Sequence, residues 1–466
     1  MAEDIARGSA TPDGGAHQRG RRAGRWPLSM IALRSIASRF TWIGLNTITG
    51  ILAARALQPQ GRGELAAMIL WPTLVGGLTA FGLPKALIYH VRRDPKQASA
   101  LAGSAALLCF LATIIGTAIA WHVIPLWLRR QPEHTIFVAQ LCLLVVPIHA
   151  LSMLGRSAWE ASGHFGRSNL SQLIPPSLVV VGLGVQTWYG VLTPVSAAAT
   201  YVLAGVPPFV WMLVSVARDY RPTLRGVTHM WRRLLHYGGR SYGADLAGIL
   251  AHYLDQALVV GLLSSASMGI YVVALSLANV VAAVNQSVSM IVFPRAVGLE
   301  PREMARKVAQ SARMGSMAGC AIGITVLTAG PLLLRVLYGS AFAAAAQILP
   351  ILVFRIIIGG FGNMLRQGFL AAGRPGIVTG IQVAGISLTV PLLLVLVPRF
   401  GLVGAALTLL TVAITRLGLT LACYRWILRV PMPRLWINGT DLAVLARYRA
   451  EIVSSVLRPR TAAGVK

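Results

Sequence analysis

Residues 240–296 read RSYGADLAGILAHYLDQALVVGLLSSASMGIYVVALSLANVVAAVNQSVSMIVFPRA. The stretch begins with about 23 mostly apolar residues, long enough to cross a bilayer as a helix, yet it contains Asp245, His252, Asp255 and Gln256. At about 100° per residue, Asp245, His252 and Gln256 fall on one stripe of this helix, with Asp255 about 80° to the side. A carboxylate facing lipid at mid-membrane would cost roughly 2.5–3.5 kcal/mol. The stripe must therefore face another helix or water.

The second half of the stretch predicts another helix with a polar face. Its apolar run from Met268 to Phe293 contains Asn279 and Gln286, which are seven residues apart and so lie on one side of a helix. The two helices together predict a polar seam inside an apolar bundle. Gln256, Asn279 and Gln286 are our candidates for polar groups that line a cavity.

The composition of the whole chain indicates a membrane protein. Hydrophobic residues make up 55% of its 466 residues and charged residues 12%, with a mean hydropathy of +0.67. A soluble protein carries about twice that charged fraction. The four cysteines lie singly in apolar stretches without a CxxC pair, so we predict no metal site and no cofactor.

Apolar segments recur along the chain and predict an all-α integral membrane protein with about twelve transmembrane helices. They lie at residues 40–57, 64–90, 99–123, 134–155, 168–189, 194–217, 240–262, 267–293, 314–337, 342–365, 375–397 and 400–423. We divide the chain accordingly into a disordered basic cytoplasmic tail (1–34), a six-helix bundle (35–217), a cytoplasmic linker (218–239), a second six-helix bundle (240–423) and a basic cytoplasmic tail (424–466). For the last segment, an interfacial helix at 435–457 is an expectation.

The positive charges are distributed unequally between the two sides of the predicted bundle. Of the lysines and arginines outside the spans, 33 fall on one side and 5 on the other. By the positive-inside rule this split predicts that both termini are cytoplasmic. The net charge of +28 then reflects topology and attraction to anionic phospholipids, and we expect no binding to nucleic acid.

A weak internal repeat relates the two halves of the chain. Gly63 and Gly269 occupy similar contexts 206 residues apart, and the pairs Gly155 with Gly362 and Gly166 with Gly373 are 207 apart. Because each half has an even number of helices, both halves enter the membrane from the same side. This predicts two bundles related by a pseudo-two-fold axis along the membrane normal, with the substrate cavity between them.

Charged residues inside the spans are the candidates for chemistry. Arg355 lies near mid-membrane, where snorkelling cannot rescue a guanidinium, and Arg366 follows eleven residues later on the same stripe. We expect Arg355 to face a cavity and bind substrate, or else to pair with Asp255 and hold the halves together. Lys85 and Arg55 are further candidates: for Lys85 a snorkelling side chain is an equal alternative, and for Arg55 snorkelling or packing is the preferred interpretation. Arg416 is interpreted as a snorkelling side chain.

In-span cations outnumber in-span acids, so the cavity is expected to be positive and to suit an anionic substrate such as a diphosphate. The acids Asp245 and Asp255, together with His252, either couple transport to a cation gradient or only balance the cavity's own arginines. The sequence leaves both roles open.

Several runs resemble those of a known family. They are LAARALQPQGRGELA, YLDQALVVGLLSSASMGIYVVALSL with its terminal FPR, and LLLRVLYGSAFAAAAQILPIL leading to LAAGRPG. In order and spacing over about residues 35–425, they are similar to the Wzx-type oligosaccharide flippases of the multidrug/oligosaccharidyl-lipid/polysaccharide exporter superfamily. The resemblance implies alternating access and export of undecaprenyl-diphosphate-linked sugars. It also implies a cationic lumen, for which Lys85 and Arg355 are the nearest matches here.

We therefore expect a flippase for capsule, O-antigen or exopolysaccharide assembly, and not an enzyme. The chain has no GxxxxGK[ST] loop for ATP and no HExxH or GxSxG motif. A cation-coupled multidrug exporter of the same superfamily is the alternative, and a membrane polysaccharide polymerase is a weaker one. The expected setting is the bacterial inner membrane, as a monomer. The expected partners are a lipid-linked glycan, anionic phospholipids, a polysaccharide polymerase and a chain-length regulator.

Overall fold

The computed structural model describes residues 28–296 and 299–433, and every element assigned in these ranges is helical. The α-helices are α1 (Leu28–Thr79), α2 (Leu83–Arg93), α3 (Ala98–Trp127), α4 (Glu133–Cys142), α5 (Val146–Ala161), α6 (Phe165–Trp188), α7 (Pro194–Leu203), α8 (Val206–Tyr220), α9 (Val227–Leu262), α10 (Ser265–Ala296), α11 (Pro301–Leu333), α12 (Ala345–Ala371) and α13 (Pro375–Trp426). Short 3-10 or π turns form η1 (Pro95–Gln97), η2 (Leu143–Val145), η3 (Leu334–Tyr338) and η4 (Ser340–Phe342).

Two of these helices are double-length and each contains two predicted spans. Helix α1 breaks at Gln58 (φ 59°, ψ 177°), directly before Pro59, and α13 breaks at Gly401 (φ 54°, ψ −129°). A residue before proline avoids the α-helical region, and the left-handed region at the second break favours glycine. Each break therefore separates two helices that cross in opposite directions.

The helices account for every span predicted from hydropathy. By length and apolarity, eight described helices could cross a membrane, or nine when α1 and α2, bent by 42°, count as one broken span. The predicted number is higher because α1 and α13 are each continuous over two spans, and because the apolar part of α9 that is described, Tyr253–Leu262, is shorter than a span. The protein is an all-α membrane protein, as expected.

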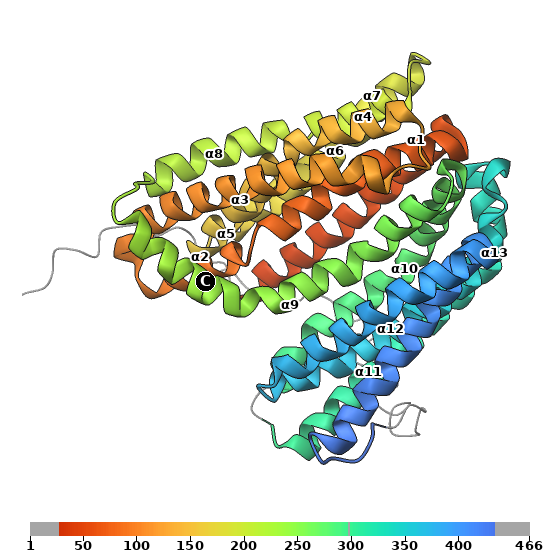
Figure 1. The fold of residues 1–466 in the computed structure, drawn as a ribbon. Helices are drawn as coiled ribbons and strands as arrows, with labels where there is room; N and C mark the ends of the chain where they lie inside the picture. Colours follow the sequence, from red (N-terminus) through yellow and green to blue (C-terminus); the bar gives the residue numbers. More distant parts are fainter. Residues whose placement is uncertain (1–27, 297–298, 434–466) are drawn as a thin grey trace, which may run out of the picture.

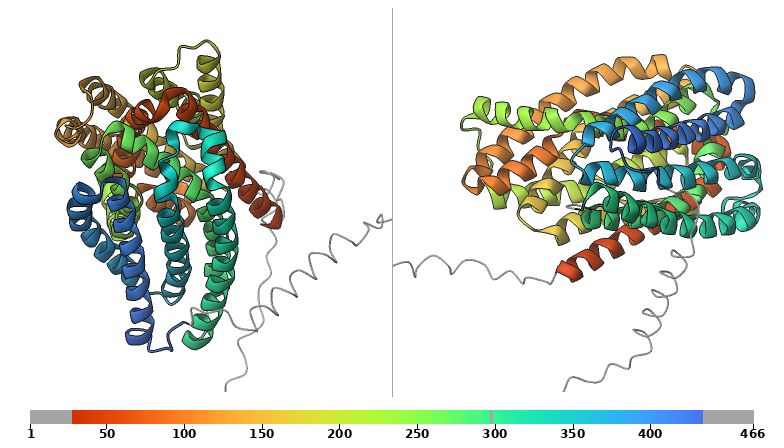
Figure 2. Two further views of the ribbon diagram at one scale, coloured as in Figure 1. Left: turned by 90° about the vertical axis from the view of Figure 1, so that its right-hand side faces the viewer. Right: turned by 90° about the horizontal axis from the view of Figure 1, so that it is seen from below.

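The ribbons form two lobes that diverge like the arms of a V (Figure 1). Helices α1–α8 make up the amino-terminal lobe and α10–α13 the carboxyl-terminal lobe, and α9 runs between them. Figure 2 shows from below that most helices run in roughly one direction, as membrane spans do.

The lobes meet at one end of the V (Figure 1). There Trp127 donates from Nε1 to the carbonyl of Ala257 (2.7 Å), and Gln131 donates from Nε2 to that of Val260 (3.1 Å). Ser265 donates to Oε1 of Gln131 at 2.6 Å. Val260 lies in the last turn of α9, where carbonyls lack partners within their own helix, and Gln131 supplies one. The lobes are thus fastened at one end of the V and spread at the other.

The expected cytoplasmic linker at 218–239 is mostly helical in the structure. The non-helical segment spans 221–226, and α9 begins at Val227. Met230 and Leu234 are buried in one core with Leu83, Leu87 and Leu101 of the amino-terminal lobe. Sequence reasoning treated this stretch as a loop because its five arginines obscured the two apolar residues four apart.

The terminal segments differ from expectation where the structure describes them. Residues 28–34, assigned to a disordered tail, form the first turns of α1. Residues 424–426, assigned to the other tail, complete α13. The rest of the predicted tails, at 1–27 and 434–466, lies outside the described residues.

Candidate functional site

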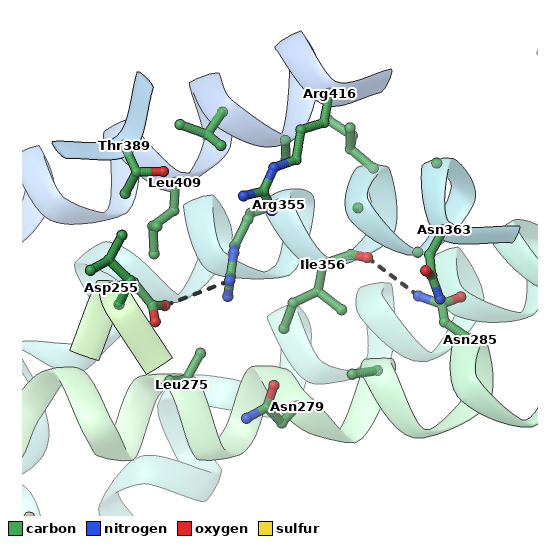
Figure 3. Close-up of a pocket in the computed structure, with 18 of the residues that line it drawn as sticks. Asp255, Leu275, Asn279, Asn285, Arg355, Ile356, Asn363, Thr389, Leu409 and Arg416 are labelled. Carbon is green, nitrogen blue, oxygen red and sulfur yellow. Dashed lines mark hydrogen bonds and ion pairs between the residues drawn. The ribbon is translucent and has the colours of Figure 1, made fainter. Parts of the chain in front are cut away.

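A cavity of about 290 Å³ lies where α9, α10, α12 and α13 meet. Six residues singled out from the sequence line it: Asp255 and Gln256 on α9, Asn279 and Gln286 on α10, and Arg355 and Arg366 on α12. Arg416, Asn285 and Asn363 also line it, and Figure 3 shows the cavity with most of these side chains. We expected the cavity between the two bundles. The residues that line it come instead from α9 and the carboxyl-terminal lobe.

Asp255 and Arg355 form an ion pair inside the cavity. Nη2 of Arg355 lies 3.6 Å from Oδ2 of Asp255, as Figure 3 shows. The same oxygen accepts a hydrogen bond from the Tyr271 hydroxyl at 3.2 Å, and Oδ1 accepts one from the backbone N–H of Gln256 at 2.9 Å. The Asp255 side chain is 5% exposed and that of Arg355 is 24% exposed. The carboxylate is therefore fully held by the protein, whereas the guanidinium keeps a face toward the cavity.

Arg366 and Arg416 bring two further guanidinium groups into the same space. The Nε atom of each is buried and has no hydrogen-bond partner in the described part of the chain. Figure 3 shows Arg416 reaching from α13 toward Arg355. Among the described lining residues there are thus three arginines and one carboxylate. The low polarity of the surroundings strengthens the resulting positive potential.

Glycines in α12 make room for the polar groups of the cavity. A Cβ on Gly360 would lie 2.0 Å from Nδ2 of Asn285, so only glycine allows that amide to approach α12. Asn285 donates from Nδ2 to the carbonyl of Ile356 (3.3 Å), while its buried Oδ1 lacks a described partner. The glycine-rich run that followed Arg355 in the sequence therefore has a packing role.

The amino-terminal lobe contributes one cation at the rim of this cavity. Arg39 of α1 donates from Nη2 to Oε1 of Gln286 at 2.8 Å, and its guanidinium lies 4.9 Å from the ring centroid of Trp42. This contact joins α1 to α10 on the spread side of the lobes. Sequence reasoning counted Arg39 only as a topology signal.

Two predicted cations lie elsewhere. Lys85 is an exposed residue of α2 and lines a separate hollow with Tyr89, Arg92, Arg93 and Tyr237. Arg55 is exposed and donates to the carbonyl of Val336 at 2.6 Å. Neither belongs to the cavity around Arg355. The side chains of Asp245 and His252 are outside the described residues, so their predicted role stays a prediction.

Sequence reasoning missed Arg416 and Tyr271 as members of the site. Arg416 was interpreted as a snorkelling residue because it lies near the inner end of its span. Its position over Gly385, whose Cβ would lie 1.8 Å from Nε of Arg416, was not visible in the sequence. No group of three metal-ligating side chains lies together in the part of the chain that the structure describes.

Residues 51–347 match a family described as polysaccharide biosynthesis protein. The chain belongs to this family. The match covers both halves of the chain, from α1 into α12, and includes α9 and α10 with Asp255, Asn279 and Gln286. The resemblance inferred from sequence runs is thereby confirmed for the family.

Two curated proteins are similar to this chain in sequence. A probable low-salt glycan biosynthesis flippase of Haloferax volcanii is 22% identical over 211 residues, which span 44% of each protein. A putative O-antigen transporter of Shigella flexneri is 21% identical over 373 residues, which span 76% of this chain and 87% of the relative. The first match thus covers less than half of the relative's length.

Solved structures establish the fold independently. A lipid II flippase, MurJ, in an inward closed conformation superposes with a TM-score of 0.72 at 11% identity, covering 92% of this chain and 94% of the other. An inward-facing multidrug transporter of the same superfamily gives 0.67 at 14% identity, over 83% and 94%. The fold is therefore common to flippases and drug exporters, and only the site can distinguish them.

Proposed function

We propose that the protein is a flippase that moves a diphosphate-linked, lipid-anchored oligosaccharide from the cytoplasmic to the outer leaflet without making or breaking covalent bonds. One observation carries this proposal: the cavity around Arg355 contains three arginines and one carboxylate among its described residues. A membrane interior stabilises such an excess only when an anion binds there or water enters. The charge fits a ligand with several negative oxygens.

Arginine is the residue best suited to that ligand. Its planar guanidinium can donate two parallel hydrogen bonds to phosphate oxygens, whereas lysine acts as a point charge. Arg355 is partly occupied by Asp255, so Arg366 and Arg416, with their unpartnered Nε atoms, are the principal phosphate donors. The exposed amides of Asn279 and Asn363 can add hydrogen bonds to sugar hydroxyls.

The arrangement of the lobes supports alternating access. They are fastened at the outer end by the bonds of Trp127, Gln131 and Ser265 and spread at the cytoplasmic end. A headgroup can therefore enter from the cytoplasm while its prenyl chain stays in lipid. Binding that favours the outward-open state would shift the population toward it.

The family and the names of the relatives support a biological setting for this activity. We infer export of an undecaprenyl-diphosphate-linked glycan for capsule, O-antigen or exopolysaccharide assembly, in a bacterial inner membrane with both termini cytoplasmic. The protein would act as a monomer, receive the glycan from glycosyltransferases and deliver it to a polymerase with its chain-length regulator. The excess of cytoplasmic cations supports this orientation and contacts with anionic phospholipids.

The multidrug exporter is the second candidate on this fold. An exporter of organic cations requires a neutral or acidic, aromatic-lined cavity. The described lining of this cavity contains no aromatic residue and has an excess of cations. A polymerase would require catalytic groups in an outer loop, and the polar site instead lies among the helices.

A transport assay with purified protein in vesicles tests the proposal. A fluorescent short-chain prenyl diphosphate disaccharide is added to one leaflet, and its appearance in the other is followed with a membrane-impermeant quencher. Wild-type protein should speed this exchange, and Arg366→Gln and Arg416→Gln should each slow it about tenfold or more, as expected from losing a charged hydrogen bond.

Arg399→Gln is the matched control, because Arg399 is an exposed cation between the two halves of α13. It should exchange the probe at the wild-type rate. Wild-type vesicles that move a lipophilic organic cation but leave the disaccharide in place would establish the exporter instead.

A further inference from the structure

Helices α2 and α9 line a second, open hollow, remote from the arginine cavity. It has a volume of about 600 Å³ and is lined by Lys85, Ile88, Tyr89, Arg92, Arg93 and Tyr237. All but Ile88 are cationic or aromatic. The cations belong to the side with the excess of positive charge, and α2 ends at Arg93, just before the loop to α3. The hollow thus opens at the cytoplasmic end of the amino-terminal lobe.

The two tyrosines of this hollow form a stacked pair of rings, here called the tyrosine platform. The rings of Tyr89 and Tyr237 stack with centroids 4.3 Å apart and an interplanar angle of 13°. Tyr89 is 37% exposed, although large aromatic rings normally bury more of their surface. One face of Tyr89 is stacked on Tyr237, and the Arg93 guanidinium lies 5.9 Å from the Tyr89 ring centroid. The exposed part of the pair can receive a sugar ring, whose C–H groups pack on aromatic faces.

The arginines beside the platform are held in place without losing their charge. Arg93 donates from Nη1 to the Tyr89 hydroxyl at 2.7 Å, and Arg92 donates from Nη2 to the backbone carbonyl of Glu160 at 2.8 Å. Both acceptors are neutral. Each guanidinium therefore retains N–H donors and a full positive charge beside the tyrosine platform.

Distance separates this hollow from the arginine cavity. Tyr237 and Asp255 lie on the same helix, 18 residues apart, which corresponds to about 27 Å along a helix at 1.5 Å per residue. A diphosphate cannot contact both places at once. One helix thus connects a polar site at the cytoplasmic mouth with one deeper in the membrane.

We propose that this hollow is a separate docking site for a sugar diphosphate headgroup, occupied before the headgroup moves to the arginine cavity. Tyr89 and Tyr237 recognise the first sugar, and Arg92 and Arg93 bind phosphate. An anionic phospholipid shares the phosphate but has no sugar ring, so the platform is the feature that selects the glycan. This inference rests on the proposed function for the identity of its ligand.

The first test measures binding to full-length protein in nanodiscs of zwitterionic lipid, with Arg366→Gln and Arg416→Gln present so that the deep cavity is weakened. The probes are a short-chain prenyl diphosphate bearing N-acetylglucosamine, the same diphosphate without sugar, and phosphatidylglycerol. Tyr237→Leu should weaken the glycosylated probe about tenfold, the loss expected from an aromatic stacking contact, and leave the sugar-free diphosphate unchanged. Combined Arg92→Gln and Arg93→Gln should weaken both.

Two variants control for folding and for general charge. Tyr237→Phe keeps the ring and should bind like the parent protein, and Arg225→Gln removes an exposed cation from the adjacent loop and should do the same. Equal binding of the glycosylated probe by Tyr237→Leu overturns the proposal. The hollow would instead be a phospholipid site if two results were obtained. Phosphatidylglycerol would displace the glycosylated probe, and its affinity would fall in the Arg92→Gln and Arg93→Gln variant but not in Tyr237→Leu.

Transport kinetics separate this site from the proposed function. In vesicles, changes at Tyr237, Arg92 and Arg93 should raise the half-saturating probe concentration and leave the maximal rate unchanged, whereas Arg366→Gln should lower the maximal rate. A wild-type protein that fails to move the probe refutes the flippase, while nanodisc binding still decides whether the docking site exists. Variants of Tyr237, Arg92 or Arg93 that lower only the maximal rate would contradict a docking role.

Discussion

Gly63 of α1 and Gly269 of α10 lie against each other where the two helices cross. A Cβ on Gly63 would lie 1.7 Å from the carbonyl oxygen of Ser265, and one on Gly269 would lie 1.9 Å from that of Pro59. The contact is reciprocal, and the two glycines are the pair found 206 residues apart in the sequence repeat. The lobes thus meet backbone to backbone at a place where no side chain fits.

Substituting either glycine should force the lobes apart at this crossing. We expect Gly63→Ala and Gly269→Ala each to destabilise the protein by about 1–3 kcal/mol, because the neighbouring atoms are backbone and cannot rotate away. Melting of the purified protein in detergent measures the effect. Gly44→Ala on the same helix is the control, since nothing lies within 4 Å of its Cβ position. Equal melting temperatures for all three variants would contradict a tight crossing.

The Asp255–Arg355 pair can be separated into structural and substrate-binding roles. Arg355→Gln leaves a buried carboxylate without its cation, which typically costs about 3–5 kcal/mol, so the yield of folded protein should fall. Asp255→Asn together with Arg355→Gln should restore the yield, because the amide oxygen still accepts from the Gln256 N–H and the amide NH2 can donate to the Tyr271 hydroxyl oxygen. Transport by this double variant is then informative: low transport identifies Arg355 as a phosphate contact, and normal transport limits it to pairing. A double variant no better folded than Arg355→Gln would refute the structural pair.

The position of Arg416 depends on the absence of a side chain at Gly385. Gly385→Ala would place a Cβ 1.8 Å from Nε of Arg416 and should push the guanidinium out of the cavity. We expect transport of the lipid-linked disaccharide to fall by about tenfold, comparable to losing one charged hydrogen bond, with melting temperature much less affected because the arginine tip is flexible. Gly380→Ala lies one helical turn and a half away with open space around it and is the matched control. Normal transport by Gly385→Ala would show that Arg416 is dispensable.

Topology can be measured with single cysteines in a variant lacking the four native ones. Leu224, 56% exposed between α8 and α9, should react with an impermeant thiol reagent only after the membrane is opened, because it lies on the side richer in cations. Tyr189, 74% exposed after α6, should react in intact cells. The opposite pattern would reverse the predicted orientation and, with it, the direction in which the V opens.

Local sequence pattern was enough to predict the helices and several members of the site. Helical periodicity placed Asn279 and Gln286 on one face, and Arg355 and Arg366 on one stripe, and all four line the same cavity. These predictions succeed because an α-helix fixes the angle between residues whatever surrounds it. Hydropathy located the spans for a similar reason, since each helix must satisfy its own backbone in lipid.

Only the tertiary structure decided which helices share a cavity. Lys85 and Arg55 carry the same charge signal as Arg355, yet they lie at opposite ends of the molecule, while Arg416 joins the cavity from α13. The expected linker became the first turns of α9 because Met230 and Leu234 found a core in the amino-terminal lobe. Charge and periodicity describe one helix at a time. Contacts between helix faces depend on close packing of helices that are far apart in the chain, as at Gly63 and Gly269. The sequence of one segment therefore does not determine them.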